Sequence, residues 1–176
     1  FDQVSDREKG EVGAHPCGRC QVGEVAFCTG LSPRDIQRLS TVVGQIQIPA
    51  NTAVFREGEA AVYLYSVALG TLKLYKLMPD GRRQITAFLF PGDFFGLAVE
   101  GGYAYTAEAL GPVVLCRFPR RKLDQILEDV PRIEKRLLGL AIDELAAAHE
   151  QMLLLGRKTA KEKVASFLMM LSRRAG

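Results

Sequence analysis

The stretch between Gly44 and Phe118 constrains the fold more than any other part of the sequence, because it alternates short apolar runs with turn signals. The runs are rich in Val, Ile, Leu, Phe and Tyr, and the turns include PAN, EGE, ALG, PDG, PGD, EGG and LGP. Strand-length segments at this spacing are typical of an antiparallel sandwich or barrel. The sequence therefore predicts a mainly β unit here.

The clearest hairpin in this unit is LKLYKLMPDGRRQITAFLF, residues 72–90. Its turn is Asp80-Gly81, a pair that tolerates the positive φ angles of a tight hairpin. Leu72 and Leu74 alternate with polar or amphipathic neighbours, as in a sheet with one buried face.

Helical signals flank the β unit on both sides. The segment LSPRDIQRLSTVV, residues 31–43, predicts a short helix with Ser32 as N-cap, Pro33 at its first position and Asp35 in a capping pair. The segment PRRKLDQILEDV, residues 119–130, predicts a second short helix. In the last segment, KTAKEKVASFLMMLSRRAG, a capping box of Thr159 and Glu162 precedes an apolar stripe. We interpret this last segment as the first helix of a further unit.

A long helix is predicted from Pro131 to near Gly156. One set of its apolar residues is spaced 3, 4, 3, 4, 3, which is a heptad seam: Leu138, Ala141, Leu145, Ala148, Met152 and Leu155. A second set lies on an adjacent face: Ile133, Leu137, Leu140, Glu144 and Gln151. A single broad face lying on the β unit is the simpler interpretation. We favour one stripe against the β unit and a separate seam that forms a parallel homodimer.

Three of the four cysteines fall within the segment HPCGRCQVGEVAFC, residues 15–28, with the spacing C-x2-C-x7-C, and the fourth is Cys116. Taken alone, Cys116 fits a buried thiol that fills a core. The polar, Gly-rich arm around Cys17, Cys20 and Cys28 argues against a purely structural role for those three. Four thiolates can bind zinc or a [4Fe–4S] cluster, and a thiol–disulfide switch is a third possibility. The spacing alone does not separate these alternatives, and His15 is a further candidate ligand.

Composition narrows the class of protein. The 176 residues carry a net charge of +3, which gives little support for nucleic acid contact by this part of the chain. No apolar run reaches the ~18–20 residues of a membrane span, and no signal peptide is visible, so we expect a cytoplasmic protein without membrane contact. No hydrolase triad, metal-hydrolase motif or phosphate loop is present, so we do not expect an enzyme.

The combination of a Cys-rich arm, LKLYKLMPDGRRQITAFLFPGDFFG, a long helix and a final LSRR resembles the Crp/Fnr superfamily of bacterial transcription regulators. The four cysteines are most similar to those of the FNR-type oxygen sensors, in the FnrL/FnrN/FixK-like branch. The resemblance implies a cyclic-nucleotide-binding-type β-roll (jelly roll), a dimerisation helix and a winged helix-turn-helix. It also implies that Cys17, Cys20, Cys28 and Cys116 hold an oxygen-labile [4Fe–4S] cluster. Zinc on the same four cysteines stays the alternative that the residues themselves leave open. Arg19 and Arg117 adjoin two of these cysteines and are candidate counter-charges.

This chain departs from the superfamily at the residues that bind a cyclic nucleotide. The resemblance implies a Glu and an Arg for the ribose and phosphate, but this chain has Leu97 and Tyr105 at or near those positions. Independently, no Lys, Arg or His occurs from Gln84 to Cys116. We therefore expect no nucleotide-binding residues and exclude cAMP as the effector.

The resulting organisation has four parts: a cysteine-rich arm (1–30), a β-roll sensor domain with short flanking helices (31–130), a dimerisation helix (131–156), and the start of a DNA-binding domain whose remainder is absent (157–176). The resemblance implies an oxygen-responsive regulator whose cluster controls dimerisation and DNA binding. It also suggests RNA polymerase as a partner for the hairpin around Asp80-Gly81, although a solvated turn explains that hairpin equally well.

Overall fold

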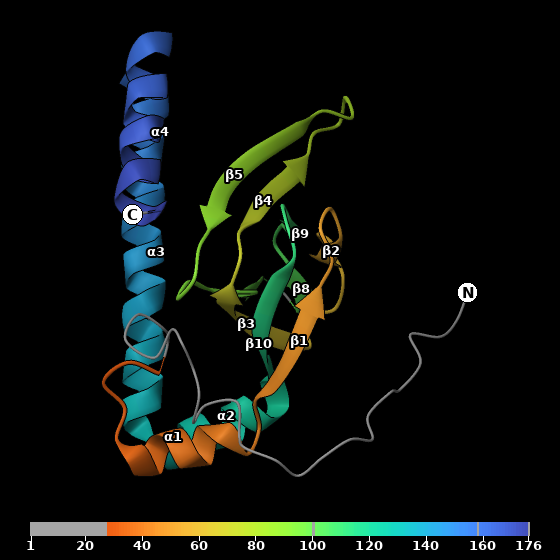
Figure 1. The fold of residues 1–176 in the computed structure, drawn as a ribbon, viewed down its shortest axis with the longest axis vertical. Coiled ribbons are helices and arrows are strands. Elements are labelled where there is room, and N and C mark those ends of the chain that lie inside the picture. The colour runs from red at the N-terminus through yellow and green to blue at the C-terminus, as the bar shows by residue number, and fades with distance from the viewer. Residues whose placement is uncertain (1–27, 100, 158, 176) are drawn as a thin grey trace, which may run out of the picture.

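The computed structural model of the chain describes residues 28–99, 101–157 and 159–175. Helix α1 (Pro33–Ser40) precedes a β roll, and three helices follow it: α2 (Arg120–Asp129), α3 (Pro131–Arg157) and α4 (Ala160–Ala175). Helices α1 and α2 lie at the foot of the roll, and α3 rises beside it (Figure 1). This arrangement confirms the predicted fold class, a β roll followed by a long helix. No described helix is long and apolar enough to cross a membrane.

The roll consists of two four-stranded antiparallel sheets and a short ribbon. The first sheet has the order β1-β10-β3-β6, the second has the order β2-β9-β4-β5, and β7 pairs with β8. The strands are β1 (Gly44–Ile48), β2 (Ala53–Phe55), β3 (Tyr63–Leu69), β4 (Leu72–Leu77), β5 (Arg83–Leu89), β6 (Phe94–Phe95), β7 (Ala98–Val99), β8 (Gly102–Tyr103), β9 (Thr106–Ala109) and β10 (Val113–Pro119). Neighbours such as β1 and β10 come from opposite ends of the roll, so the first sheet closes the unit.

The predicted hairpin is confirmed as β4 and β5. Met78 N–H donates to the Arg82 carbonyl oxygen at 2.8 Å, and Gly81 has a φ of +83°. The Asp80 carboxylate accepts from Arg82 N–H at 3.0 Å and from Arg82 Nε at 2.7 Å. These bonds lower the pKa of the exposed Asp80 carboxyl. The turn residues identified from sequence therefore close the hairpin as expected.

Two apolar clusters organise the structure. The first, which we call the roll core, lies between the sheets and includes Val67, Leu72, Phe95 and Leu115. The second, which we call the helix–roll cluster, has six buried members: Leu39, Leu64, Phe118, Leu123, Val130 and Ile133. They come from α1, β3, β10, α2, the residue after α2, and α3. The outer face of the first sheet is therefore covered by the helices.

The helix boundaries follow from local chemistry. Ser32 Oγ accepts from Asp35 N–H at 3.2 Å and donates to the Asp35 carboxylate at 2.6 Å, which confirms the predicted cap of α1. The capping box before α4 is confirmed as well, since the Glu162 carboxylate accepts from Thr159 N–H at 2.8 Å. Pro131 begins α3, and the helix ends at Arg157, one residue beyond the predicted Gly156.

Candidate cysteine site and the interior of the roll

Cys116 lies in β10 on the outer face of the first sheet. Its neighbours Val113 and Leu115 face the roll core, whereas Cys116 and Phe118 belong to the helix–roll cluster. Cys116 stands between Gln45 of β1 and Ser66 of β3 in the sheet register. The thiol is half-buried, so β10 presents it at the boundary between the sheet and the helices.

Cys28 reaches the same cluster from the other end of the chain. Its carbonyl oxygen accepts from Leu31 N–H at 3.2 Å, in a turn that leads into the N-cap of α1. Cys28 and Leu31 both pack against the helix–roll cluster, and Cys28 is half-buried. The fold therefore brings two of the four predicted ligands to one apolar cluster.

The other two predicted ligands, Cys17 and Cys20, lie outside the described residues, as do His15 and Arg19. Within the described ranges, no group of three or more His, Cys, Asp or Glu side chains is placed to hold a metal ion. Arg117, the neighbour of Cys116, has its guanidinium carbon 4.5 Å from the centre of the Tyr63 ring. Because strand neighbours alternate faces, Arg117 lies on the face of the sheet opposite Cys116.

Helix α3 has two distinct apolar faces in its described half. Ile133 is fully buried in the helix–roll cluster, and Leu137 and Leu140 pack against that cluster. Leu138 and Leu145, both predicted seam residues, are 60% and 58% exposed. At about 100° per residue, the two groups are centred about 120° apart around the helix axis. Ile142 is 57% exposed as well, and the predicted heptad seam did not include it.

The other predicted seam residues say less about which side of α3 is exposed. Ala141 is half-buried. Ala148, Met152 and Leu155 belong to the backbone of α3, but their side chains are not among the described ones. The separation of the two faces is therefore established by the first half of the helix.

Aromatic rings fill the interior of the roll beside the β6–β8 segment. The rings of Phe55 and Tyr103 stack with centroids 3.7 Å apart, and those of Tyr65 and Phe95 are 5.3 Å apart. Tyr103 Oη donates to the Tyr63 carbonyl oxygen at 2.9 Å. Burial raises the pKa of the Tyr65 hydroxyl, which stays neutral at physiological pH. Aromatic rings therefore occupy this interior, and the guanidinium of Arg117 lies against it at the Tyr63 ring.

Arg120, the first residue of α2, is a polar group that the sequence analysis missed. Its Nε donates to the Ala61 carbonyl oxygen at 2.8 Å and its Nη2 to the Gly96 carbonyl oxygen at 3.0 Å. Its backbone N–H donates to the Val62 carbonyl oxygen at 2.9 Å. Arg120 lies outside the cation-free stretch from Gln84 to Cys116 and reaches the Gly96 turn from α2, so no signal in the sequence indicated this contact.

An open hollow of about 660 Å³ adjoins this region and shares Tyr103 with it; it is lined by Glu57, Gly58, Ala60, Lys76 and residues 101–104. Lys76 is the one cation among the described residues that line it, and its Nζ lies 2.8 Å from Glu57 Oε1. An anion in the hollow would therefore compete with Glu57 for Lys76.

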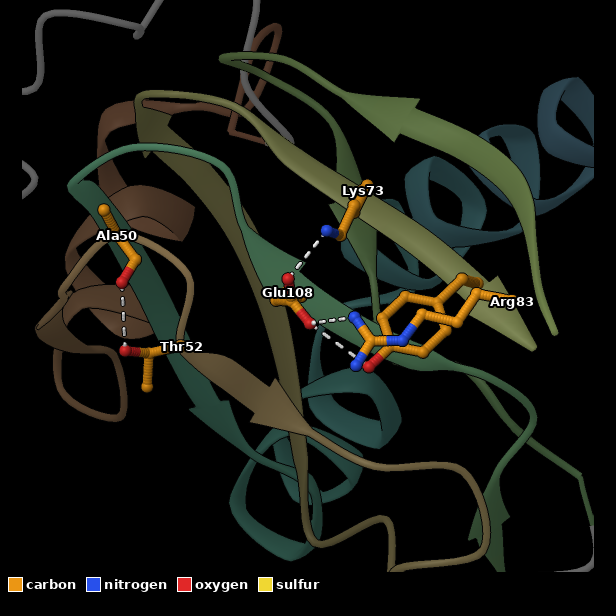
Figure 2. A network of polar contacts seen from close by, with 6 residues as sticks. Ala50, Thr52, Lys73, Arg83 and Glu108 are labelled. Carbon is orange, nitrogen blue, oxygen red and sulfur yellow. Dashed lines mark hydrogen bonds and ion pairs between the residues drawn. The ribbon is translucent and has the colours of Figure 1, made fainter. Parts of the chain in front are cut away.

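Figure 2 shows a separate polar network around Glu108 of β9, on the outer face of the second sheet. Lys73 Nζ lies 2.7 Å from Glu108 Oε1, and Arg83 Nη1 lies 3.4 Å from Oε2. Tyr75 Oη donates to the same carboxylate at 3.2 Å. The hydrogen bond from Lys73 lowers the pKa of Glu108, against a desolvation that raises it. This network joins β4, β5 and β9 and lies apart from the cysteines.

The chain is similar to several known proteins. The cyclic nucleotide-binding domain family matches residues 45–130. The nitrogen fixation regulation protein FixK of Bradyrhizobium diazoefficiens is 36% identical over 159 residues, which cover 90% of this chain and 67% of that protein. The transcriptional activatory protein AadR of Rhodopseudomonas palustris is 41% identical over 85% of this chain and 63% of its own length.

The transcriptional activator protein FnrL of Cereibacter sphaeroides is 36% identical over 91% of this chain and 64% of its own length. Among solved structures, FixK2 from Bradyrhizobium japonicum superposes with a TM-score of 0.72 at 38% identity, covering 76% of this chain and 67% of that one. The chain thus spans about two thirds of the length of these relatives, or slightly less.

Proposed function

Since the chain belongs to the Crp/Fnr family of transcription regulators, we propose that it is an oxygen-responsive regulator with a [4Fe–4S] cluster on Cys17, Cys20, Cys28 and Cys116. The state of this site controls dimerisation through α3 and thereby binding to DNA. The DNA-reading unit is the domain that α4 begins. The hairpin of β4 and β5 is a candidate contact for RNA polymerase.

One observation carries this proposal: Cys28 and Cys116, far apart in sequence, contact the same helix–roll cluster as the first half of α3. Sulfur ligands of iron–sulfur clusters are cysteine thiolates, and their apolar surroundings limit access of solvent. The donor type and the half-buried position of both thiols fit such a group. When bound, a [4Fe–4S] cluster would supply the oxygen-labile bonds that the family resemblance implies.

The residues of the chain link this site to the dimer seam. A site shared by the arm cysteines and Cys116 of β10 would hold the arm and α1 against the helix–roll cluster. Ile133 and Leu137 of α3 share that cluster, so the orientation of α3 on the roll depends on how it is packed. The exposed stripe of Leu138, Ile142 and Leu145 then meets its copy in a second chain. A coupling of roughly 1–3 kcal/mol between site and seam is typical of such switches.

Cyclic AMP has no part in this proposal. The aromatic interior supports its exclusion, because Tyr103 and Tyr105 occupy the roll beside the Gly96 turn. The sequence places no cation between Gln84 and Cys116, and Arg120 is engaged by two carbonyl oxygens. Titration calorimetry with cAMP is expected to give no heat of binding at millimolar ligand.

The test of the cluster is anaerobic purification followed by metal and sulfide analysis. We expect brown protein with about four iron and four sulfide per chain. Cys116→Ser should lower the iron content sharply while the circular dichroism spectrum keeps its shape, and Ser66→Ala, its cross-strand neighbour, should leave the iron content unchanged. One zinc per chain without visible absorbance would refute the cluster in favour of a zinc site. Loss of two thiols in air without any metal would instead indicate a disulfide switch.

A further inference from the structure

Arg120 holds two loops of the roll to the start of α2. Three of its donors, the backbone N–H, Nε and Nη2, reach the backbone carbonyl oxygens of Val62, Ala61 and Gly96 respectively. A guanidinium presents several donors in a rigid fork, and hydrogen bonds from a charged donor are about twice as strong as neutral ones. The contact therefore resists displacement of α2 from the roll.

The Gly96 turn is held from its other side by the aromatic interior. Gly96 N–H donates to Tyr105 Oη at 3.1 Å, and its φ is +95°. A Cβ at this position would lie 3.2 Å from the Tyr65 ring and 3.3 Å from the Tyr63 carbonyl oxygen. The turn is thus fixed between the packed tyrosines and Arg120.

Among the residues that the structure describes, no side chain caps the N-terminus of α2. Its N-cap position is Pro119, which makes no side-chain cap, and its first turn holds no acidic residue. Three consecutive cations, Arg120, Arg121 and Lys122, begin the helix. Positive charge is unfavourable at the positive end of a helix dipole. The bonds of Arg120 to the roll offset that cost and set where α2 begins.

The other side of α2 faces the candidate site and α3. Leu123 is fully buried in the helix–roll cluster. Ile126 packs against the same cluster, as do Cys28 and Cys116. The junction to α3 is short: Val130 N–H donates to the Ile126 carbonyl oxygen and Ile133 N–H to the Val130 carbonyl oxygen, both at 2.9 Å. Helix α2 therefore connects the cysteine-bearing cluster to α3.

We propose that Arg120 is the positioning residue that couples the cysteine site to α3. With the start of α2 fixed on the roll, a change of packing around Cys28 and Cys116 moves α3. Without this anchor, α2 rocks on the cluster and absorbs the change. The regulatory role rests on the proposed function. The contacts that join Arg120, α2 and α3 do not depend on it.

The first experiment is amide hydrogen exchange on the metal-free protein, comparing Arg120→Met with the matched variant Arg121→Met, whose side chain is exposed. We expect Arg120→Met to lower protection about tenfold or more both at residues 61–62 and 96–97 and at the start of α3, residues 132–140. Arg121→Met should change neither region. Faster exchange confined to the two loops, with α3 unchanged, would overturn the proposal.

The second experiment measures the dimer dissociation constant by sedimentation, with the site loaded and with it emptied. In the wild type we expect a ratio of roughly 5- to 150-fold between the two states. In Arg120→Met the ratio should fall below threefold at normal iron content, and Arg120→Lys should lie in between because a single ammonium reaches fewer carbonyls at once. An unchanged ratio with lower thermal stability in both states would mean a merely structural residue and refute the coupling.

The two failures are distinguishable. If the wild type itself shows no difference between the loaded and the emptied site, control of dimerisation, and with it the proposed function, is refuted. The exchange experiment then still decides whether Arg120 connects the roll to α3.

Discussion

Truncation of Leu145 tests the assignment of the dimer seam. Leu145 is 58% exposed on α3, on the side away from the helix–roll cluster. Leu145→Ala removes three carbon groups, each worth about 0.8 kcal/mol when fully buried. If a second copy covers the 58% that is exposed, the loss is about 1.4 kcal/mol in each chain. A two-fold interface repeats the loss, so the dimer weakens by about 2.8 kcal/mol, or about 100-fold in Kd.

The assay is sedimentation equilibrium of the chain over a range of concentrations, together with a thermal melt of the monomer. The matched control is Leu69→Ala, because Leu69 is 57% exposed at the end of β3 and lies off the seam. Leu145→Ala should raise the dimer Kd and leave the monomer melt within a degree or two, whereas Leu69→Ala should change neither. A Kd within threefold of wild type for Leu145→Ala would refute the seam.

Three further predictions concern the folded unit. Ile133→Ala, on the buried face of α3, should cost about 2–5 kcal/mol of unfolding free energy in urea, and a loss below 1 kcal/mol would contradict its burial. Gly70→Ala should cost more than Gly81→Ala: both have positive φ, worth about 1–2 kcal/mol, but only the Cβ at Gly70 meets atoms, at 2.6 Å from the Pro112 carbonyl oxygen. Equal urea midpoints for the two would refute the clash. Glu108→Gln should cost about 1.5–3 kcal/mol at pH 7. Because the folded pKa lies below its ordinary value of 4.5, this stability is present above pH 4.5 and is lost as the pH falls through the folded pKa, so the variant should show a flatter acid melting profile.

Local signals in the sequence determined the secondary structure well. The turn at Asp80-Gly81, the cap at Ser32 and the start of α3 at Pro131 each depend on chemistry within a few residues, so the sequence alone suffices to place them. The two faces of α3 were also predictable, because a helix fixes the angle between residues three and four apart. The prediction omitted Ile142, because a heptad seam takes only two positions in seven and the apolar stripe that the roll leaves exposed is wider.

The tertiary structure decided which distant groups meet. Sheet pairing sets Cys116 between Gln45 and Ser66, and only that register turns its thiol toward the cluster that Cys28 also contacts. The same alternation turns Arg117 to the opposite face, which adjacency in sequence could not reveal. The partners of Arg120 are the carbonyl oxygens of Ala61, Val62 and Gly96, and a backbone carbonyl has no signature in sequence. Periodicity and caps act over one or two turns of chain, whereas these contacts depend on how complete sheets and helices pack together.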